Sequence, residues 1–315
     1  MSRLTDRAAL TAYRAGWSLV RRLPERVAYA VFDLIADVAA RRGGSGVARM
    51  RANFARVRPE LDAAGLDALV RAGMRSYFRY WCEAFRLPDL TEADLVARVR
   101  TLGDAPVRAH LGAGKPAVMF LGHMGNWDLA GAWSTTQLAP VTTVAERLKP
   151  EELYDEFLGF RERLGMRILP LTGGSDVFRE LTKALRASAF VALLADRDLT
   201  AGGVEVDFCG HRARMAVGPA ALAVTTGAAL HPVSVHYERR ATGRGYELVI
   251  VFHDRVVVPA TGTTREKVAT MTQACADALT GAVREHTEDW HMMQRVFVED
   301  LDPARMPVAS AEGAA

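Results

Sequence analysis

Cysteine is scarce in this sequence. The chain contains three, Cys82, Cys209 and Cys275, which lie far apart and form no CxxC pair. This spacing indicates neither a zinc site nor a disulfide framework, and a low, odd count is typical of a reducing compartment. No stretch approaches about 18 uncharged apolar residues, so no membrane-spanning helix is expected. Charges within residues 1–12 also interrupt the apolar run that a signal peptide needs.

Several catalytic motifs are absent as well. No G-x-S-x-G elbow supports a serine acyl-enzyme, and no P-loop or G-x-G-x-x-G supports nucleotide binding. Internal repeats and a convincing central linker are also missing. We therefore expect a single domain over residues 1–302, followed by a flexible tail over residues 303–315 that is rich in Ala, Pro and Gly.

The charges that are present are distributed unevenly. Formal net charge is only +3, but residues 1–60 hold 12 basic and 5 acidic side chains, a net of +7. Residues 61–315 hold 28 basic and 32 acidic side chains, a net of −4. This asymmetry favours a polyanionic partner for the N-terminal part, either nucleic acid or anionic lipid.

The basic N-terminal part also has a helical pattern. Apolar and aromatic residues, including Tyr13 and Trp17, recur every three or four positions over residues 7–42, with Pro24 separating two helices. An amphipathic, Arg-rich helix with aromatic residues can lie in a membrane interface. An ordinary helix packed on the domain is the alternative.

Short apolar strands alternate with helical segments through the rest of the chain. The pattern predicts strands at 115–122, 141–145, 167–171, 190–195, 230–237 and 246–258, the last two compatible with antiparallel pairing. It predicts helices within 62–98 and at 126–137, 150–164, 176–186 and 264–286. Such alternation indicates an α/β fold, with a central mixed sheet flanked by helices and preceded by amphipathic helices.

One histidine stands where α/β enzymes place their chemistry. His123 follows the apolar strand 115–122, and Asp128 follows five positions later. Sites in open α/β sheets lie beyond the carboxyl ends of strands. A turn can bring Asp128 back to the imidazole, where the carboxylate would fix the tautomer of a general base. A structural histidine at a strand end is the alternative, since H-x4-D alone is a weak motif.

Two other classes of function fit parts of the sequence. A metal hydrolase would use His123, Asp128, Asp196 and Asp198, provided that their side chains converge. A non-catalytic basic protein would bind nucleic acid or membrane through residues 1–60. That second class leaves the residues around His123 unexplained.

The segment Leu121–Gly131 (LGHMGNWDLAG) resembles the H-x4-D block of the lysophospholipid acyltransferase superfamily, in its bacterial lipid A acyltransferase branch. The similarity is greatest to the members that acylate phosphatidylinositol mannosides, and it runs from the first helix to about Phe297. Further blocks match in the same order: VAERL at 144–148, FRER at 160–163, ADRDL at 195–199, GVEVDF at 203–208, GPA at 218–220 and Trp290.

The resemblance implies a role for each matching residue. His123 would be the general base for an acceptor hydroxyl, assisted by Asp128. Glu205 would work with the histidine. Glu146 and Arg161 would form a buried charge pair that shapes the site; without the resemblance, a surface ion pair is the simpler interpretation.

A second group of basic residues could hold phosphate. Arg197, Arg212 and Arg214 could bind the phosphates of coenzyme A or of a lipid headgroup, because a guanidinium donates two parallel hydrogen bonds. Asp196 and Asp198 flank Arg197, which argues against a simple anion patch.

The resemblance also implies the substrates. We expect acyl-CoA as co-substrate, a long, palmitoyl-like acyl chain, and mannosylated phosphatidylinositol as acceptor, with lipid A-type lipids as the alternative. No metal, other cofactor or nucleic acid is expected. The protein would be peripheral on the cytoplasmic face of the membrane. An apolar acyl channel would begin at His123, with Trp127, Trp133, Ala130 and residues 77–81 as available walls.

Overall fold

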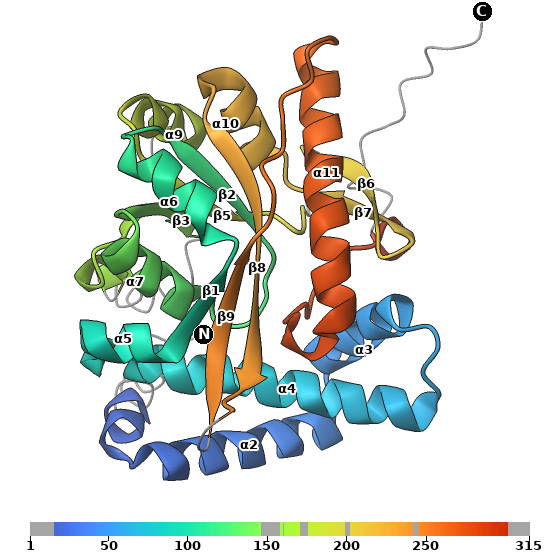
Figure 1. Ribbon diagram of the computed structural model, residues 1–315. Helices are drawn as coiled ribbons and strands as arrows, with labels where there is room; N and C mark the ends of the chain where they lie inside the picture. Colours follow the sequence, from blue (N-terminus) through green and yellow to red (C-terminus); the bar gives the residue numbers. More distant parts are fainter. Residues whose placement is uncertain are drawn as a thin grey trace, which may run out of the picture.

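The computed structural model describes residues 16–145, 158–159, 161–170, 176–198, 202–241 and 245–301 (Figure 1). Most of the expected helix 150–164 and the whole tail 303–315 lie outside the described residues.

Four named helices precede strand β1 (Val99–Leu102), after a helical segment over residues 16–22. They are α2 (Glu25–Arg42), α3 (Ser45–Val57), α4 (Ala63–Arg86) and α5 (Glu92–Arg98), with a 3₁₀ turn at Leu87–Asp89. Pro24 stands immediately before α2, as the sequence predicts. Helix α3 was not predicted: Gly43 and Gly44, both with positive φ, separate two helices instead of ending the helical region.

A mixed seven-stranded sheet forms the centre, which confirms the predicted fold class. Its order is β1-β9-β8-β2-β5-β3-β4. The pairs β8–β2, β2–β5, β5–β3 and β3–β4 are parallel, whereas β8 and β9 are antiparallel as expected. The strands are β1 (Val99–Leu102), β2 (Ala117–Leu121), β3 (Val141–Ala145), β4 (Arg167–Pro170), β5 (Phe190–Leu194), β8 (Ala229–Arg239) and β9 (Tyr246–Phe252).

A separate antiparallel hairpin and further helices complete the fold. The hairpin consists of β6 (Val204–Phe208) and β7 (His211–Met215). The remaining helices are α6 (Asp104–Gly112), α7 (Trp127–Gln137), α9 (Val177–Arg186), α10 (Gly218–Thr226) and α11 (Thr264–Glu285), with 3₁₀ turns at Thr287–Asp289 and Val298–Asp300. The sequence pattern missed β1, α6 and α10, which are short.

Both faces of the sheet are covered, because every side chain of β2 is buried. Val118 and Phe120 pack in one core cluster with α9, α10 and α11. Met119 and Leu121 alternate with them and pack in a second cluster with α5, α6 and α7. A strand buried on both faces appears in sequence as a continuous apolar run, which is why this strand was predictable.

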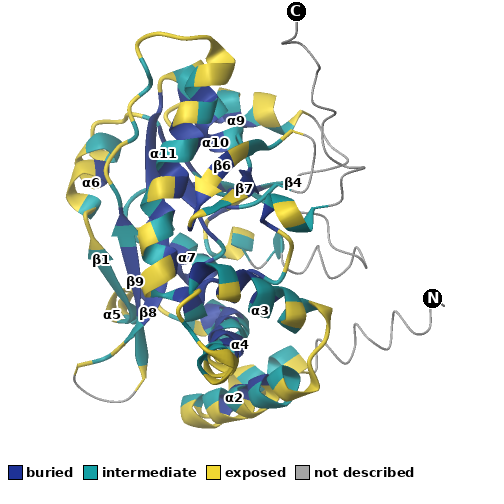
Figure 2. Ribbon diagram, turned by 90° about the vertical axis from the view of Figure 1, so that its right-hand side faces the viewer, coloured by how far each residue is buried: buried dark blue, intermediate teal, exposed yellow. Residues whose placement is uncertain are grey.

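Helix α4 lies across one end of the sheet, with α2 packed outside it (Figure 1). Strand β8 points toward α4, and β2 and β5 run parallel to it, so their carboxyl ends are directed toward the same end of the molecule. Figure 2 shows α2 with its outer side exposed at the same end of the molecule. Among the described residues, no helix combines the length and apolar character needed to cross a bilayer.

Candidate active site

The parallel register of β2 and β5 brings His123 to Asp196. Leu121 pairs with Leu194, so the residue two positions after each strand occupies the same level of the sheet. The backbone N–H of His123 donates to Asp196 Oδ2 over 2.9 Å. The imidazole Nδ1 lies 2.5 Å from Asp196 Oδ1. One buried carboxylate therefore fixes both the backbone and the ring of His123.

Asp196 is held as an anion. Burial by itself would raise the pKa of this carboxyl, but the charge of His123 and the hydrogen bonds from His123 and Trp290 lower it below its usual value. A carboxylate accepts only, so the His123 proton stands on Nδ1. The opposite nitrogen, Nε2, has no hydrogen-bond partner in the described part of the chain, and the His123 side chain is 20 % exposed. This tautomer is the one that a general base needs.

The segment after α11 clamps the turn that carries His123. Trp290, which is fully buried, donates its indole N–H to Asp196 Oδ2 over 2.9 Å. The His291 N–H donates to the carbonyl of His123, and the Gly125 N–H donates to the carbonyl of Asp289. These contacts give a structural reason why Trp290 and the segment around His123 occur together among the matching sequence blocks.

Gly125 is required by this packing. Its φ is +53°, and a Cβ placed there would lie 2.8 Å from the carbonyl oxygen of Val235. That oxygen belongs to the backbone of a central strand and cannot move aside, so a side chain at position 125 would displace the turn.

Asp128 does not hold the imidazole, contrary to the sequence-based expectation. Helix α7 begins at Trp127, which directs Asp128 away from His123 and toward Arg161. Its carboxylate accepts from Arg161 Nε over 2.6 Å and Nη2 over 3.2 Å, and from the Tyr80 hydroxyl over 2.8 Å. The orienting contact belongs to Asp196. Asp128 instead ties α7 to α4 and to Arg161.

Asn126 and Glu83 fix the start of α7. The Asn126 carbonyl oxygen accepts from the Leu129 N–H as the N-terminal cap, and its amide donates to Glu83 over 2.8 Å. Glu83 also accepts from the hydroxyls of Tyr29 and Tyr237. A charged acceptor with three donors holds the amide in the one orientation that caps the helix.

The expected partnership of Glu205 with the histidine is not present. Glu205 is 40 % exposed on the β6–β7 hairpin, where it lies 3.2 Å from Arg212 and 3.9 Å from Arg214. Arg212 also contacts Asp207. The pairing register of the hairpin sets these neighbours, because Glu205 stands directly opposite Arg214.

The structure agrees with the sequence-based expectation for some of the other site residues and differs for others. Arg161 lies at the site in a buried charge pair, but its observed partner is Asp128. Glu146 lies outside the described residues. Arg197 donates to Gln294, and Arg214 donates to the carbonyl of Gly203 over 2.7 Å. The three arginines that were expected to bind phosphate together therefore interact with other groups of the chain.

The four residues of the metal-hydrolase alternative do not share one centre. Asp196 is directed at His123 and Asp128 at Arg161, and the four side chains form no group with metal-binding spacing among the described residues. Among the described residues, the group with metal-binding spacing is His286, Glu288 and Asp289. Asp289 accepts from Ser76 and from the Tyr237 N–H, and burial raises its pKa to about 7.

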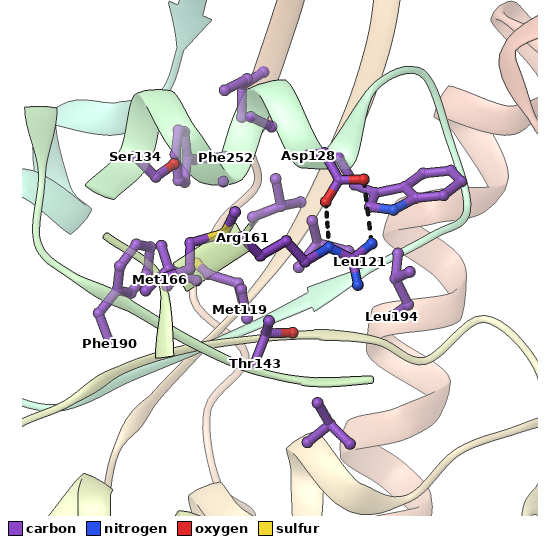
Figure 3. Close-up of a pocket in the computed structure, with 18 residues that line it drawn as sticks. Met119, Leu121, Asp128, Ser134, Thr143, Arg161, Met166, Phe190, Leu194 and Phe252 are labelled. Atoms are coloured by element: carbon purple, nitrogen blue, oxygen red, sulfur yellow. Dashed lines mark hydrogen bonds and ion pairs between the residues drawn. The ribbon is translucent and has the colours of Figure 1, made fainter. Parts of the chain in front are cut away.

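An apolar pocket lies between α7 and the sheet, and one of its lining residues, Trp127, has its ring centroid 5.7 Å from that of His123. Leu121 and Leu194 stand two residues before the His123–Asp196 pair, at the end that Asp128 and Arg161 close (Figure 3). Ser134, Met166 and Phe190 lie toward the other end. The remaining lining residues are Met119, Trp127, Ala130, Gly131, Val141, Thr143, Val144, Ala192, Val233, Ile250 and Phe252.

The sequence-based predictions included Asp196 only as a candidate metal ligand and as a neighbour of Arg197. A signal for its role does exist. Asp196 comes two residues after the buried strand 190–194, just as His123 comes two residues after 117–121. Polar residues at equivalent positions after two strands become neighbours only if those strands pair, and strand order was not predictable.

These features together define an α/β enzyme that carries a histidine–aspartate pair at the carboxyl ends of parallel strands, beside an apolar pocket. The model of the bacterial lipid A biosynthesis acyltransferase family matches residues 2–299. The chain belongs to this family and is an acyltransferase.

Relatives in mycobacteria are similar over nearly the whole chain. The phosphatidylinositol mannoside acyltransferase of Mycolicibacterium smegmatis is 43 % identical over 294 residues, which cover 93 % of this chain and 92 % of the relative. The protein of the same name from Mycobacterium tuberculosis is 45 % identical over 307 residues, covering 96 % and 93 %.

The Asp196 contact predicts the effect of a single substitution. Asp196→Asn removes the charge that stabilises an imidazolium, and in either orientation its amide N–H groups face at least one of the three donors that the carboxylate accepts from. We expect the acyl-transfer rate to fall about 10²–10⁴-fold, with the far-ultraviolet circular dichroism spectrum unchanged. Asp207→Asn, on the exposed hairpin, is the matched control and should retain the wild-type rate. A rate within about threefold of wild type for Asp196→Asn would contradict the assignment.

Proposed function

We propose that this enzyme transfers a long-chain fatty acyl group from acyl-CoA to a mannose hydroxyl of a phosphatidylinositol mannoside. The observation that carries the proposal is the oriented His123–Asp196 pair, whose imidazole lies 5.7 Å, between ring centroids, from Trp127 in the lining of an apolar pocket. The acceptor is inferred from the two mycobacterial relatives, which are named as phosphatidylinositol mannoside acyltransferases.

His123 acts as the general base. Its free Nε2 takes the proton of the acceptor hydroxyl, and the oxygen attacks the thioester carbonyl carbon. The C–S bond then breaks, and the imidazolium returns its proton to the departing thiolate. Asp196 stabilises the imidazolium between these two steps, since its buried carboxylate lies 2.5 Å from Nδ1.

A transfer assay tests this proposal. Wild-type protein is incubated with radiolabelled palmitoyl-CoA and either a phosphatidylinositol mannoside or a lipid A-type precursor, and the acylated lipid is quantified. We expect labelling of the mannoside, and about 10²–10⁴-fold less labelling with His123→Ala. His110→Ala, which removes a histidine on α6, is the matched control. Labelling of the lipid A precursor alone would contradict the proposed acceptor, and activity of His123→Ala within about tenfold of wild type would contradict the base.

The apolar pocket holds the acyl chain in this proposal. Burial of each CH₂ group contributes about 0.8 kcal/mol, so an enclosed chain of this kind binds far better than an exposed one. Ala130, on the α7 wall, is 5 % exposed as a residue and faces this space. A large side chain there would shorten the room available along the helix.

Ala130→Trp should therefore shift the donor preference toward shorter acyl-CoA species while some turnover remains. The measurement compares kcat/KM for donors of 8 to 16 carbons, with Ala109→Trp on α6, outside the pocket lining, as control. If the profile of Ala130→Trp matches that of the control, the acyl chain does not lie in this pocket.

The outer side of α2 supports peripheral membrane binding at the cytoplasmic face. Val27, Val31, Leu34 and Ile35 form one exposed apolar stripe, and Leu19 in the preceding helix is exposed too. Leu34 is 63 % exposed. Exposed apolar residues that follow one helix face are typical of an interfacial helix.

Exposed arginines stand at both ends of this stripe. Arg22 and Arg26 precede it and Arg41 and Arg42 follow it. Arg21, by contrast, is bound to Asp89, so it contributes little free positive charge. Cations beside an apolar stripe favour an anionic lipid surface.

Leu34→Glu should weaken binding to anionic vesicles about tenfold, because one buried leucine contributes about 1.5–3 kcal/mol. The matched control is Val257→Glu, at a residue 75 % exposed in the segment between β9 and α11, at the opposite end of the sheet. Binding measured by vesicle sedimentation should also weaken as salt is raised and when Arg22 and Arg26 become Gln. Equal loss in both Glu variants would argue against α2 as the contact.

A further inference from the structure

Arg79 is a half-buried cation whose charge the proposed chemistry does not use. It extends from α4 toward the β8–β9 hairpin. Its guanidinium carbon lies 3.6 Å from the ring centroid of Tyr246 and 4.9 Å from that of Tyr237. Stacking on an aromatic face covers the plane of a guanidinium and leaves its N–H edges available for an acceptor.

Those edges have no acceptor within the described part of the chain: no hydrogen bond or ion pair of Arg79 occurs there. The group is nevertheless charged. Burial lowers the pKa of Arg79, but Tyr237, Tyr246, Glu83 and Asp289 outweigh it, and the net shift is upward. Arg79 is half-buried and none of its guanidinium nitrogens is sealed from solvent, so an acceptor from outside the chain can approach them.

A second arginine shares the same ring. The guanidinium carbon of Arg239, at the end of β8, lies 4.9 Å from the Tyr246 centroid. Arg239 is exposed, and it also makes no hydrogen bond or ion pair with the described residues. Two cations gathered on one tyrosine repel each other, so an anion between or beside them would stabilise both.

Neighbouring acidic groups are already engaged elsewhere. Asp37 of α2 accepts from Arg75 over 2.7 and 2.8 Å. Glu83 lies beyond the Tyr237 ring, where it accepts from Asn126, Tyr29 and Tyr237. Glu238 is bound to Arg100. None of these three carboxylates accepts a hydrogen bond from Arg79 or Arg239 among the described residues.

We propose that Arg79 and Arg239, held on the Tyr246 ring, form a binding site for the phosphodiester of an anionic phospholipid headgroup. The hairpin end that carries Arg239 and Tyr246 lies at the same end of the molecule as α2 (Figures 1 and 2). Tyr237 connects it to the catalytic turn, since its N–H donates to Asp289, whose carbonyl accepts from Gly125.

The site rests on the proposed function for the identity of its lipid. A phosphatidylinositol mannoside carries one phosphodiester between its lipid and sugar parts. A phosphate held at Arg79 would place the headgroup on the face of α4 that also carries Ser76 and Tyr80, which contact Asp289 and Asp128 near the His123 turn. Bilayer phospholipid presents the same chemical group, so both sources satisfy the site.

The test uses a water-soluble headgroup and needs no catalysis. Glycerophosphoinositol is titrated by calorimetry into His123→Ala protein and into the same protein with Arg79→Gln, Arg239→Gln or the control Arg186→Gln. Inositol serves as the phosphate-free probe. We expect at least about tenfold weaker binding for each of the first two variants, the loss typical of a charge-assisted contact. Arg186→Gln, at an exposed position of α9, should bind as the parent does, and inositol should not bind.

Because Arg239 is exposed, its substitution tests the site even if Arg79→Gln disturbs the packing of α4. Equal affinity of Arg239→Gln and Arg186→Gln would overturn the proposal. In otherwise wild-type protein, a higher acceptor KM at constant vesicle binding would assign the site to the acceptor phosphate. Weaker vesicle binding at constant KM would assign it to bilayer lipid.

The two proposals fail separately. If wild-type protein acylates no mannoside but the Arg239-dependent affinity persists, the proposed function is wrong and the phosphate site stands. If transfer occurs and Arg79→Gln and Arg239→Gln leave headgroup affinity unchanged, the site is wrong and the function stands.

Discussion

The parallel pairing of β2 with β5 is the constraint on which the active site depends. His123 and Asp196 each follow their strand by two residues, and the register of the pair makes them neighbours. Because the Asp196 carboxylate also accepts the backbone N–H of His123, a shift of one residue would break both contacts and turn the side chains of one strand to the opposite face. The core on both faces of β2 opposes such a shift.

Helix α4 connects the parts of the site to one another. Side chains three or four residues apart lie on one helix face, and four of them on α4 reach different elements. Ser76 contacts Asp289, Arg79 stacks on the β8–β9 hairpin, Tyr80 donates to Asp128 and Glu83 holds Asn126. A movement of α4 would therefore disturb the turn that carries His123, the start of α7 and the hairpin together.

The polar and the apolar parts of the site lie close together but extend in different directions. The imidazole and its carboxylate lie at the strand ends, where charged groups meet α4 and the segment after α11. The apolar pocket extends in the other direction, between α7 and the sheet, with Asp128 and Arg161 at its boundary. A buried ion pair is costly unless its hydrogen bonds are satisfied, and here Tyr80 supplies the additional donor to Asp128. An amphipathic substrate, polar at its reacting end and apolar beyond it, fits this division.

The local pattern of the sequence determined much of this protein: the apolar run of β2, the alternation of strands and helices, the helix that begins after Pro24, and a histidine at a strand end. Each follows from periodicity or from turn chemistry within a few residues. The partner of the histidine was decided only by tertiary structure. Strands β3 and β4 separate β2 from β5 along the chain, yet β5 lies beside β2 in the sheet. Asp128, close in sequence, is turned away by the start of α7, whereas Asp196, 73 residues distant, is brought near. Side-chain direction depends on where a helix begins, and strand order depends on how the whole core packs, so neither could be obtained from the spacing of two residues.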